Sequence, residues 1–173
     1  MKLLDITRTG LTYIKVEFFT FSLNTLLQLF IFSGKGSIVL RPKTVQEVSK
    51  ILARCNSRKL AVVPQGGLTS LVAGSVPTFD EVILSLSLLN KVISLNPLTG
   101  VIVAEAGCVL EQLHESAAKE SLMVPLDLGA KGSCQIGGNV STGAGGIRFI
   151  KYGSLHGNVL GLEAVSPLPY PFW

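Results

Sequence analysis

Short apolar runs separated by polar or proline-containing breaks fill most of the chain after Ser37, and such runs predict β-strands. Asn96-Pro97-Leu98-Thr99-Gly100 stands between the last two runs and is typical of a hairpin turn. Strands and helices joined by connections of unequal length indicate an α+β domain with two small sheets. The predicted strands are Ile38–Leu40, Leu60–Val63, Val82–Leu84, Val92–Leu95 and Val101–Ala104.

Two segments show the helical spacing of apolar residues instead. The first begins after Thr44, which stands three residues before Glu47 in a capping box, and it ends at Asn56-Ser57. Its inward face is expected to carry Val45, Val48, Ile51, Leu52 and Cys55. The second predicted helix is Val109–Glu120, and its apolar side carries Leu110, Leu113 and Ala117. His114 on this helix is expected to be an ordinary surface residue, because charged residues surround it.

Two glycine-rich segments organise the rest of the chain. The first glycine stretch is Pro64–Ser75, the second glycine stretch is Leu128–Gly146, and each follows an apolar run that contains or ends in proline. Glycine lacks a Cβ atom, so its backbone reaches φ > 0 and its N–H groups can approach an anion such as a diphosphate. A single Gly-Gly pair is often only a tight turn, and that alternative stays open for each pair alone. Two long stretches are harder to explain as turns.

The segment 126–146 is expected to wind irregularly, because helices and strands tolerate its glycine density badly. A long structureless segment is uncommon in a compact domain unless it binds something, so ligand binding is the economical explanation. The usual nucleotide motifs do not fit. No G-x-x-x-x-G-K-[ST] occurs, and Gly143-Ala144-Gly145-Gly146 lacks the third glycine of G-x-G-x-x-G.

Composition narrows the classes of function. Hydrophobic residues make up 47% of the 173 residues and charged residues 15%, with a mean hydropathy of +0.50, so one ordinary folded domain is expected. The net charge of +4 is spread without a basic run, which argues against nucleic-acid binding. Cys55, Cys108 and Cys134 lie far apart in the sequence, which is typical of reduced thiols and argues against a zinc site.

The first 36 residues differ in pattern from the rest. Phe18–Phe32 is uncharged but shorter than the ~20 residues that a membrane helix needs, so a membrane span is not expected. Asp5 and Glu17 interrupt the basic region of a signal peptide, and a mitochondrial presequence would be richer in arginine and serine. For residues 1–36, a gene-model or splice product and an anchor or targeting segment both stay open.

Seven groups of residues carry a resemblance to a known family. They are Leu40-Arg41-Pro42, Pro64-Gln65-Gly66-Gly67, Gly74-Ser75-Val76-Pro77, Ala106-Gly107-Cys108, Pro125 to Ser133, Ile136-Gly137-Gly138-Asn139 and Tyr152 to Gly157. In this order and spacing, residues 37–165 resemble the PCMH-type FAD-binding domain of the vanillyl-alcohol oxidase superfamily. The resemblance implies an α+β fold with two small α/β subdomains. Residues 1–36 and the proline- and aromatic-rich tail 166–173 resemble nothing in this family.

The resemblance implies FAD as the cofactor, with the diphosphate held by the first glycine stretch. The second would line the flavin ring and the ribityl chain. The implied cofactor-binding residues are Pro64, Gln65, Gly66, Gly67, Thr69, Gly74, Ser75, Leu128, Gly129, Ala130, Ser133, Ile136, Gly137, Gly138, Asn139, Gly145 and Gly146. No residue of this sequence matches a catalytic or metal-binding position, because the family's substrate and metal groups follow in a portion that would come after Val165.

Within the family, the motifs are most similar to those of flavin-dependent D-2-hydroxy-acid dehydrogenases. That similarity implies hydride transfer from the α-carbon of a D-2-hydroxy acid to flavin N5, with a 2-oxo acid as product. It also implies a mitochondrial location and an electron-transfer flavoprotein as the usual electron acceptor. The alternative is a non-catalytic, truncated FAD-binding module or splice product that lacks the substrate domain.

Some residues depart from the family pattern. Leu68 stands where the family usually has Asn, and Ser70 and Ala73 stand where it has Gly. If either of the last two positions needs φ > 0, the strain is about 1–2 kcal/mol each. Gly143 replaces an Asn, so these departures together imply a reduced affinity for FAD. His156 is expected to be structural, with a polar role near the flavin as the alternative.

Overall fold

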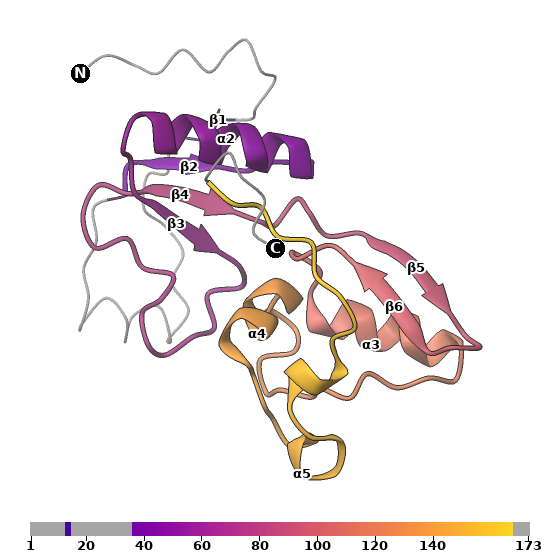
Figure 1. The fold of residues 1–173 in the computed structure, drawn as a ribbon. Helices are drawn as coiled ribbons and strands as arrows, with labels where there is room; N and C mark the ends of the chain where they lie inside the picture. The colour runs from indigo at the N-terminus through magenta and orange to yellow at the C-terminus, as the bar shows by residue number, and fades with distance from the viewer. Residues whose placement is uncertain (1–12, 15–35, 168–173) are drawn as a thin grey trace. The chain divides into compact units, whose positions relative to one another are not determined.

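The computed structural model describes residues 13–14 and 36–167 and divides them into two compact units (Figure 1). Unit 1 contains the described residues up to Pro64, residues 71–85 and the described residues from Val165 onward. Unit 2 contains residues 65–70 and 86–164. Helices and strands occur in both, which confirms the α+β class. The Phe18–Phe32 segment and most of the tail lie outside the described residues.

Unit 1 is built on a four-stranded sheet in the order β1-β2-β4-β3. Its strands are β1 (Tyr13–Ile14), β2 (Ile38–Leu40), β3 (Val62–Gln65) and β4 (Val82–Ser85). β1 pairs antiparallel with β2, and β2 pairs parallel with β4. Val82, Ile83 and Leu84 are all buried, as the continuous apolar run of a central strand requires.

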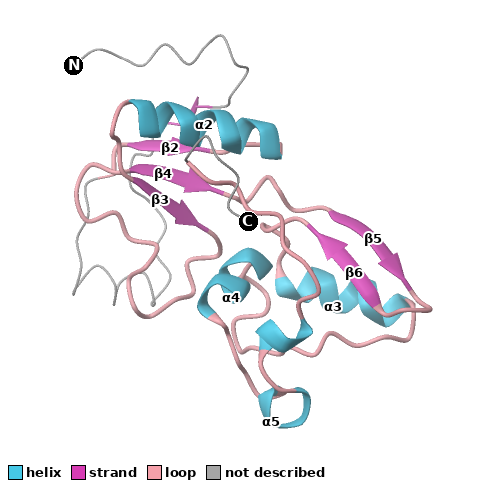
Figure 2. Ribbon diagram, in the orientation of Figure 1, coloured by secondary structure: helices cyan, strands magenta, loops and turns pink. Residues whose placement is uncertain are grey.

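The helix of unit 1, α2 (Val45–Ser57), runs alongside β2 (Figure 2). It buries Val48, Ile51 and Cys55, which follow the predicted helical spacing. Thr44 Oγ1 accepts the backbone N–H of Glu47 at 3.2 Å, so the predicted cap is present. The Glu47 carboxylate accepts the backbone N–H of Lys43 at 2.6 Å, one residue earlier than a capping box places it.

Unit 2 contains the predicted hairpin of β5 (Val92–Asn96) and β6 (Val101–Ala104), with α3 (Leu110–Lys119) beside it (Figure 2). The turn closes through Gly100, whose φ of +69° is the left-handed conformation that favours glycine. Three short helices follow, namely α4 (Ile136–Thr142), α5 (Phe149–Tyr152) and the 3-10 helix η2 (Leu155–Asn158). The core of unit 2 consists of Cys108, Leu110, Leu113, Ala117, Val124, Leu126, Cys134 and Leu155.

Two sequence-based expectations about the elements need correction. β3 starts two residues later than predicted and includes Pro64, because β3 is the last strand in the order of its sheet and an edge strand tolerates proline. The segment 126–146 is not irregular throughout, since α4 occupies its centre in spite of two glycines. Within the described part of the chain, the helices are too short or too polar to cross a membrane.

Candidate functional site

The two glycine stretches contact each other within unit 2. A Cβ atom on Gly67 would lie 1.9 Å from the carbonyl oxygen of Ser133, far inside contact distance, so only glycine fits there. A Cβ atom on Gly66 would lie 3.3 Å from Gln135 Oε1. The end of the first stretch that belongs to unit 2 therefore packs against the residues just before α4.

Backbone hydrogen bonds fix the start of α4. The N–H of Ile136 donates to the carbonyl of Cys108 at 2.9 Å, and the N–H of Gly137 donates to the carbonyl of Ala106 at 2.8 Å. A Cβ atom on Gly137 would lie 2.7 Å from Ala106 Cβ, so this glycine permits the close approach. Hydrogen bonds to residues 106–108 hold the first turn of α4. These tertiary contacts explain why a glycine-rich segment forms a helix here.

The far end of the second stretch is closed on Asp127. Gly146 has a φ of +79°, and a Cβ atom on it would lie 2.0 Å from the Asp127 carbonyl oxygen. Arg148 Nη2 lies 3.5 Å from Asp127 Oδ2, and Arg148 Nη1 donates to the carbonyl of Val124. These contacts join both ends of the segment between Asp127 and Arg148 into a closed loop.

His156 supports the C-terminal end of α4. Its Nε2 lies 2.8 Å from the carbonyl oxygen of Val140, and its backbone N–H donates to Ser154 Oγ. Gly143, which ends α4 with a φ of +64°, leaves room for the imidazole, because a Cβ atom there would lie 3.1 Å from His156 Cε1. The contacts favour the structural role expected for His156.

Among the described residues, two of the four non-glycine residues with positive φ lie in the first glycine stretch, and the other two are Lys59 and Ser121. Leu68 and Ala73 have φ values of 56° and 57°, in the left-handed region that costs a residue with a Cβ atom about 1–2 kcal/mol. Ser70 is not among the residues with positive φ. Of the two positions where φ > 0 would cause strain, Ala73 therefore has it and Ser70 does not, while the strain at Leu68 is a finding of the structure.

Two buried amide side chains flank the start of α4. Gln135 and Asn139 are 8% and 6% exposed, and Gln135 Oε1 and Asn139 Oδ1 have no hydrogen-bond partner within the described residues. Burial raises the pKa of the neighbouring Cys134 thiol, while a hydrogen bond from the Asn139 side chain acts in the opposite direction. Asn139 was expected at the site, but Gln135 was not. The signal for it was a polar residue between the apolar Cys134 and Ile136.

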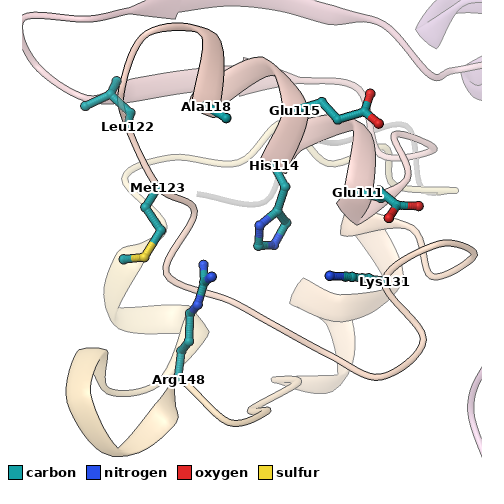
Figure 3. A pocket seen from close by; sticks show the side chains of 8 residues that line it. All are labelled: Glu111, His114, Glu115, Ala118, Leu122, Met123, Lys131 and Arg148. Carbon is teal, nitrogen blue, oxygen red and sulfur yellow. The ribbon is translucent and has the colours of Figure 1, made fainter.

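Unit 2 has a cavity of about 370 Å³. The side chains of His114, Lys131 and Arg148 point into it (Figure 3). Glu111 and Glu115 also line it, so the charge of its wall is mixed. His114 is half-buried, and its Nε2 lies 2.8 Å from the carbonyl oxygen of Leu126. The prediction of an ordinary surface histidine is therefore wrong, because a carbonyl twelve residues away holds the ring.

The structure brings most of the predicted cofactor-binding residues into unit 2. These are Gln65, Gly66, Gly67, Thr69 and all ten residues predicted in the second glycine stretch. Pro64, Gly74 and Ser75 belong to unit 1. Among the described residues, no three side chains of His, Cys, Asp or Glu gather in a way that could hold a metal ion.

The fold and the paired glycine stretches define a mixed α+β domain of the FAD-linked type. The chain belongs to the FAD binding domain family, whose pattern matches residues 36–168, and FAD is the cofactor of that domain. A solved structure of alkyldihydroxyacetonephosphate synthase has the same fold, with a TM-score of 0.75 at 18% identity. That comparison covers 84% of this chain and 28% of the synthase chain.

Curated relatives are much closer in sequence. The mitochondrial D-2-hydroxyglutarate dehydrogenase of Arabidopsis thaliana is 61% identical over 135 residues, which are 78% of this chain and 24% of that protein. The enzyme of the same name from Rattus norvegicus is 59% identical over 76% of this chain and 25% of its own length. A D-2-hydroxyglutarate–pyruvate transhydrogenase of Saccharomyces cerevisiae is 50% identical over 79% of this chain and 27% of its own. The chain thus spans about a quarter of the length of these relatives.

The residues present fit a bound dinucleotide. At Gly74, Gly129 and Gly138 an added Cβ atom would meet nothing within 4 Å, and none of the three has a left-handed φ, so the protein's own packing does not explain why they are glycines. Gly138 lies inside α4, where alanine would stabilise a helix by about 0.5–1 kcal/mol. Close approach of a ligand explains glycine at such positions.

Proposed function

We propose that this chain is the FAD-binding portion of a flavin-dependent D-2-hydroxy-acid dehydrogenase of the D-2-hydroxyglutarate type. The observation that carries the proposal is Gly138, an exposed glycine in a helix with no packing reason to be glycine. It lies one residue before the buried Asn139 and in the stretch that Gly67 contacts through Ser133. The names of the relatives support the choice of substrate class.

In this function the protein residues bind, orient and shield the cofactor. Bound FAD would accept a hydride from the α-carbon of the hydroxy acid. The seventeen residues predicted for the two glycine stretches would hold it, with small glycines admitting the ligand to the backbone and Asn139 supplying a polar side chain. The Gly67 contact with Ser133 would keep the two stretches in register around the ligand.

A second candidate is an FAD-binding module without turnover. It is supported by the family pattern itself, since the pattern that matches residues 36–168 is that of an FAD binding domain. For the longer protein, we propose a mitochondrial location, in line with the names of the relatives, and an electron-transfer flavoprotein as electron acceptor.

Titration of the purified 173-residue chain with FAD, followed by flavin absorbance and by quenching of flavin fluorescence, tests the proposal. D-2-hydroxyglutarate is then added without oxygen. Saturable binding with bleaching of the flavin would support the dehydrogenase, and binding without bleaching would support the module. The absence of saturable binding would refute both.

Gly138→Ala separates a ligand role of this glycine from a structural one. We expect the variant chain to unfold at a higher urea concentration, because alanine favours the helix, and to bind FAD more weakly, because Cβ occupies the space of the ligand. Gly157→Ala is the matched control, since Gly157 also has nothing within 4 Å and lies outside both stretches. Unchanged FAD affinity in Gly138→Ala would remove the main support for the proposal.

A further inference from the structure

Cationic side chains gather along α2, although the sequence contains no basic run. Lys50, Arg54 and Arg58 are four residues apart, and the N–H of Arg58 donates to the carbonyl of Arg54 at 3.3 Å, so all three share one side of the helix. Lys43 extends the series, because its backbone N–H donates to the carboxylate of Glu47, three residues before Lys50 on the same side. We name Lys43, Lys50, Arg54 and Arg58 the basic row.

The basic row is exposed and is not neutralised by carboxylates of the described residues. All four residues are exposed, and within the described part of the chain none of them forms an ion pair. Glu47 is the one carboxylate of α2, and it accepts the backbone N–H of Lys43. Residues 41–60 hold six of the 15 Lys and Arg of the chain and one of its 11 Asp and Glu. This segment is strongly positive, while the other residues together are slightly negative.

The stability of the helix does not explain the basic row. Lys50 and Arg54 are four residues apart, as are Arg54 and Arg58, and like charges at this spacing repel each other. Lys43 stands before the N-terminal end of α2, where the helix dipole disfavours a cation. Only Arg54 and Arg58 lie at the C-terminal end, where a cation stabilises a helix. A row of charges that weakens its own helix points to an anionic partner.

The outer face of α2 favours a membrane surface over a protein or a nucleic acid. Its other exposed residues are small or polar, namely Gln46, Ser49, Ala53 and Ser57. The face therefore lacks the aromatic or large apolar anchors of a protein interface, and it has no ring on which a base could stack. The apolar side of α2 is already buried within the protein, so α2 is not free to insert into lipid. Anionic headgroups suit such a face, because lipids move to match the charges.

We propose that the basic row is a docking surface for membranes that contain anionic lipids, with α2 lying on the headgroups and outside the hydrocarbon. The contact is electrostatic, and each cationic side chain near such a surface raises the partition constant about fivefold. Docking of this kind does not depend on FAD, because none of the four residues belongs to either glycine stretch.

Co-sedimentation of the 173-residue chain with lipid vesicles tests the proposal. One set of vesicles contains phosphatidylcholine alone, and the other contains phosphatidylcholine with phosphatidylglycerol, which is anionic. We expect the chain to bind only the second set. We also expect this binding to disappear at about 1 M salt, where charges are screened beyond about 3 Å.

A triple variant assigns the binding to the basic row. Lys50→Gln, Arg54→Gln and Arg58→Gln combined remove three charges and introduce a good helix former. We expect the partition constant on anionic vesicles to fall about a hundredfold. The variant should unfold at the same urea concentration as the original chain or a higher one, because repulsion along the helix is relieved. If the triple variant does not fold, Arg54→Gln alone should lower the partition constant about fivefold.

The matched control removes three charges from another surface. Lys91→Gln, Lys119→Gln and Lys151→Gln combined change the net charge equally, and all three lysines are exposed residues of unit 2. The partition constant of this control should stay within about twofold of the original value, because screening limits the reach of distant charges.

Four outcomes would overturn the proposal. Equal binding to neutral and anionic vesicles would show that the contact is apolar. The absence of binding to anionic vesicles would remove the proposed partner. Equal losses in the two triple variants would show that net charge matters and the basic row does not. Release of the chain from vesicles by duplex DNA, with a tighter affinity for the DNA, would assign the basic row to nucleic acid.

Discussion

The two glycine stretches differ in how well their residues suit their backbone. In the second, the left-handed positions at the end of α4 and at the contact with Asp127 are Gly143 and Gly146. In the first, the left-handed positions are Leu68 and Ala73, and each costs about 1–2 kcal/mol relative to glycine. The second stretch is thus relaxed where the first is strained. Backbone strain of this kind persists only where surrounding contacts impose it, and it is frequent at ligand sites.

Replacement of Gly67 is expected to give the largest loss of stability among the substitutions in the two stretches. Gly67→Ala would place Cβ 1.9 Å from a backbone oxygen, which cannot move like the end of a flexible side chain. We expect a loss of about 3 kcal/mol in the free energy of unfolding. Gly74→Ala in the same stretch has nothing within 4 Å and should change stability by less than about 0.5 kcal/mol. Urea denaturation of both variants checks this, and equal losses would contradict the assigned contact.

Gly143 tests whether the second stretch is relaxed because of its glycines. Gly143→Ala puts a Cβ atom at a φ of +64° and 3.1 Å from the imidazole of His156. We expect a loss of about 1–2 kcal/mol. Thermal unfolding of this variant is best compared with that of Gly138→Ala, because Gly138 lies inside the same helix without positive φ and its replacement should stabilise. A stabilised Gly143→Ala would show that the left-handed cap is not needed.

Substitutions at Leu68 and Ala73 test the strain of the first stretch by relieving it. Leu68→Asn and Ala73→Gly supply residues that tolerate the left-handed region, and each should raise the free energy of unfolding by about 0.5–1 kcal/mol. Ser70→Gly is the control, because Ser70 has no positive φ, and it should stabilise nothing. Chemical denaturation distinguishes the three, and a stabilising Ser70→Gly would contradict the account of strain.

Thiol chemistry gives the smallest and most local test of the second stretch. Burial raises the pKa of Cys134, and also those of Cys55 and Cys108, so the folded state favours their neutral form. The resulting contribution to stability is present below the pKa of an unfolded thiol and is lost as the pH rises through the higher folded value. We expect slow iodoacetamide labelling of Cys134 at neutral pH and a modest loss of stability under alkaline conditions. Rapid labelling in the native state would show that the second stretch opens.

Much of the fold could be predicted because it follows local periodicity. The hairpin around Gly100 and the buried face of α2 follow directly from spacing and turn residues. β3 was misplaced because Pro64 reads as a strand terminator, whereas an edge strand accommodates it. α4 was missed because propensity counts its glycines against a helix, while hydrogen bonds to residues 106–108 hold it.

The candidate site could be predicted only in part, for the same reason. Its glycines appear in the sequence as motifs, but the atoms that they contact are distant in the chain, as Ser133 is from Gly67. His114 was placed on the surface because its sequence neighbours are charged, and its partner, the Leu126 carbonyl, belongs to no local pattern. In the sequence Gln135 differs from its neighbours only as a polar residue between two apolar ones, and its burial and the lack of a partner for Oε1 among the described residues are known only from the structure.

The path of the chain through the two units has a consequence for how the protein folds. The chain leaves unit 1 after Pro64, returns to it at Leu71 and leaves it again after Ser85. β2 and β4 pair in parallel although α2, β3 and the first glycine stretch separate them in sequence. Closing such non-local pairings is slow, because the entropy of a long loop is lost before the pairing forms. Neither unit is a continuous piece of chain, so a nascent polypeptide cannot complete its first sheet until Ser85 has been synthesised, and proteolysis within residues 65–70 would sever both units at once.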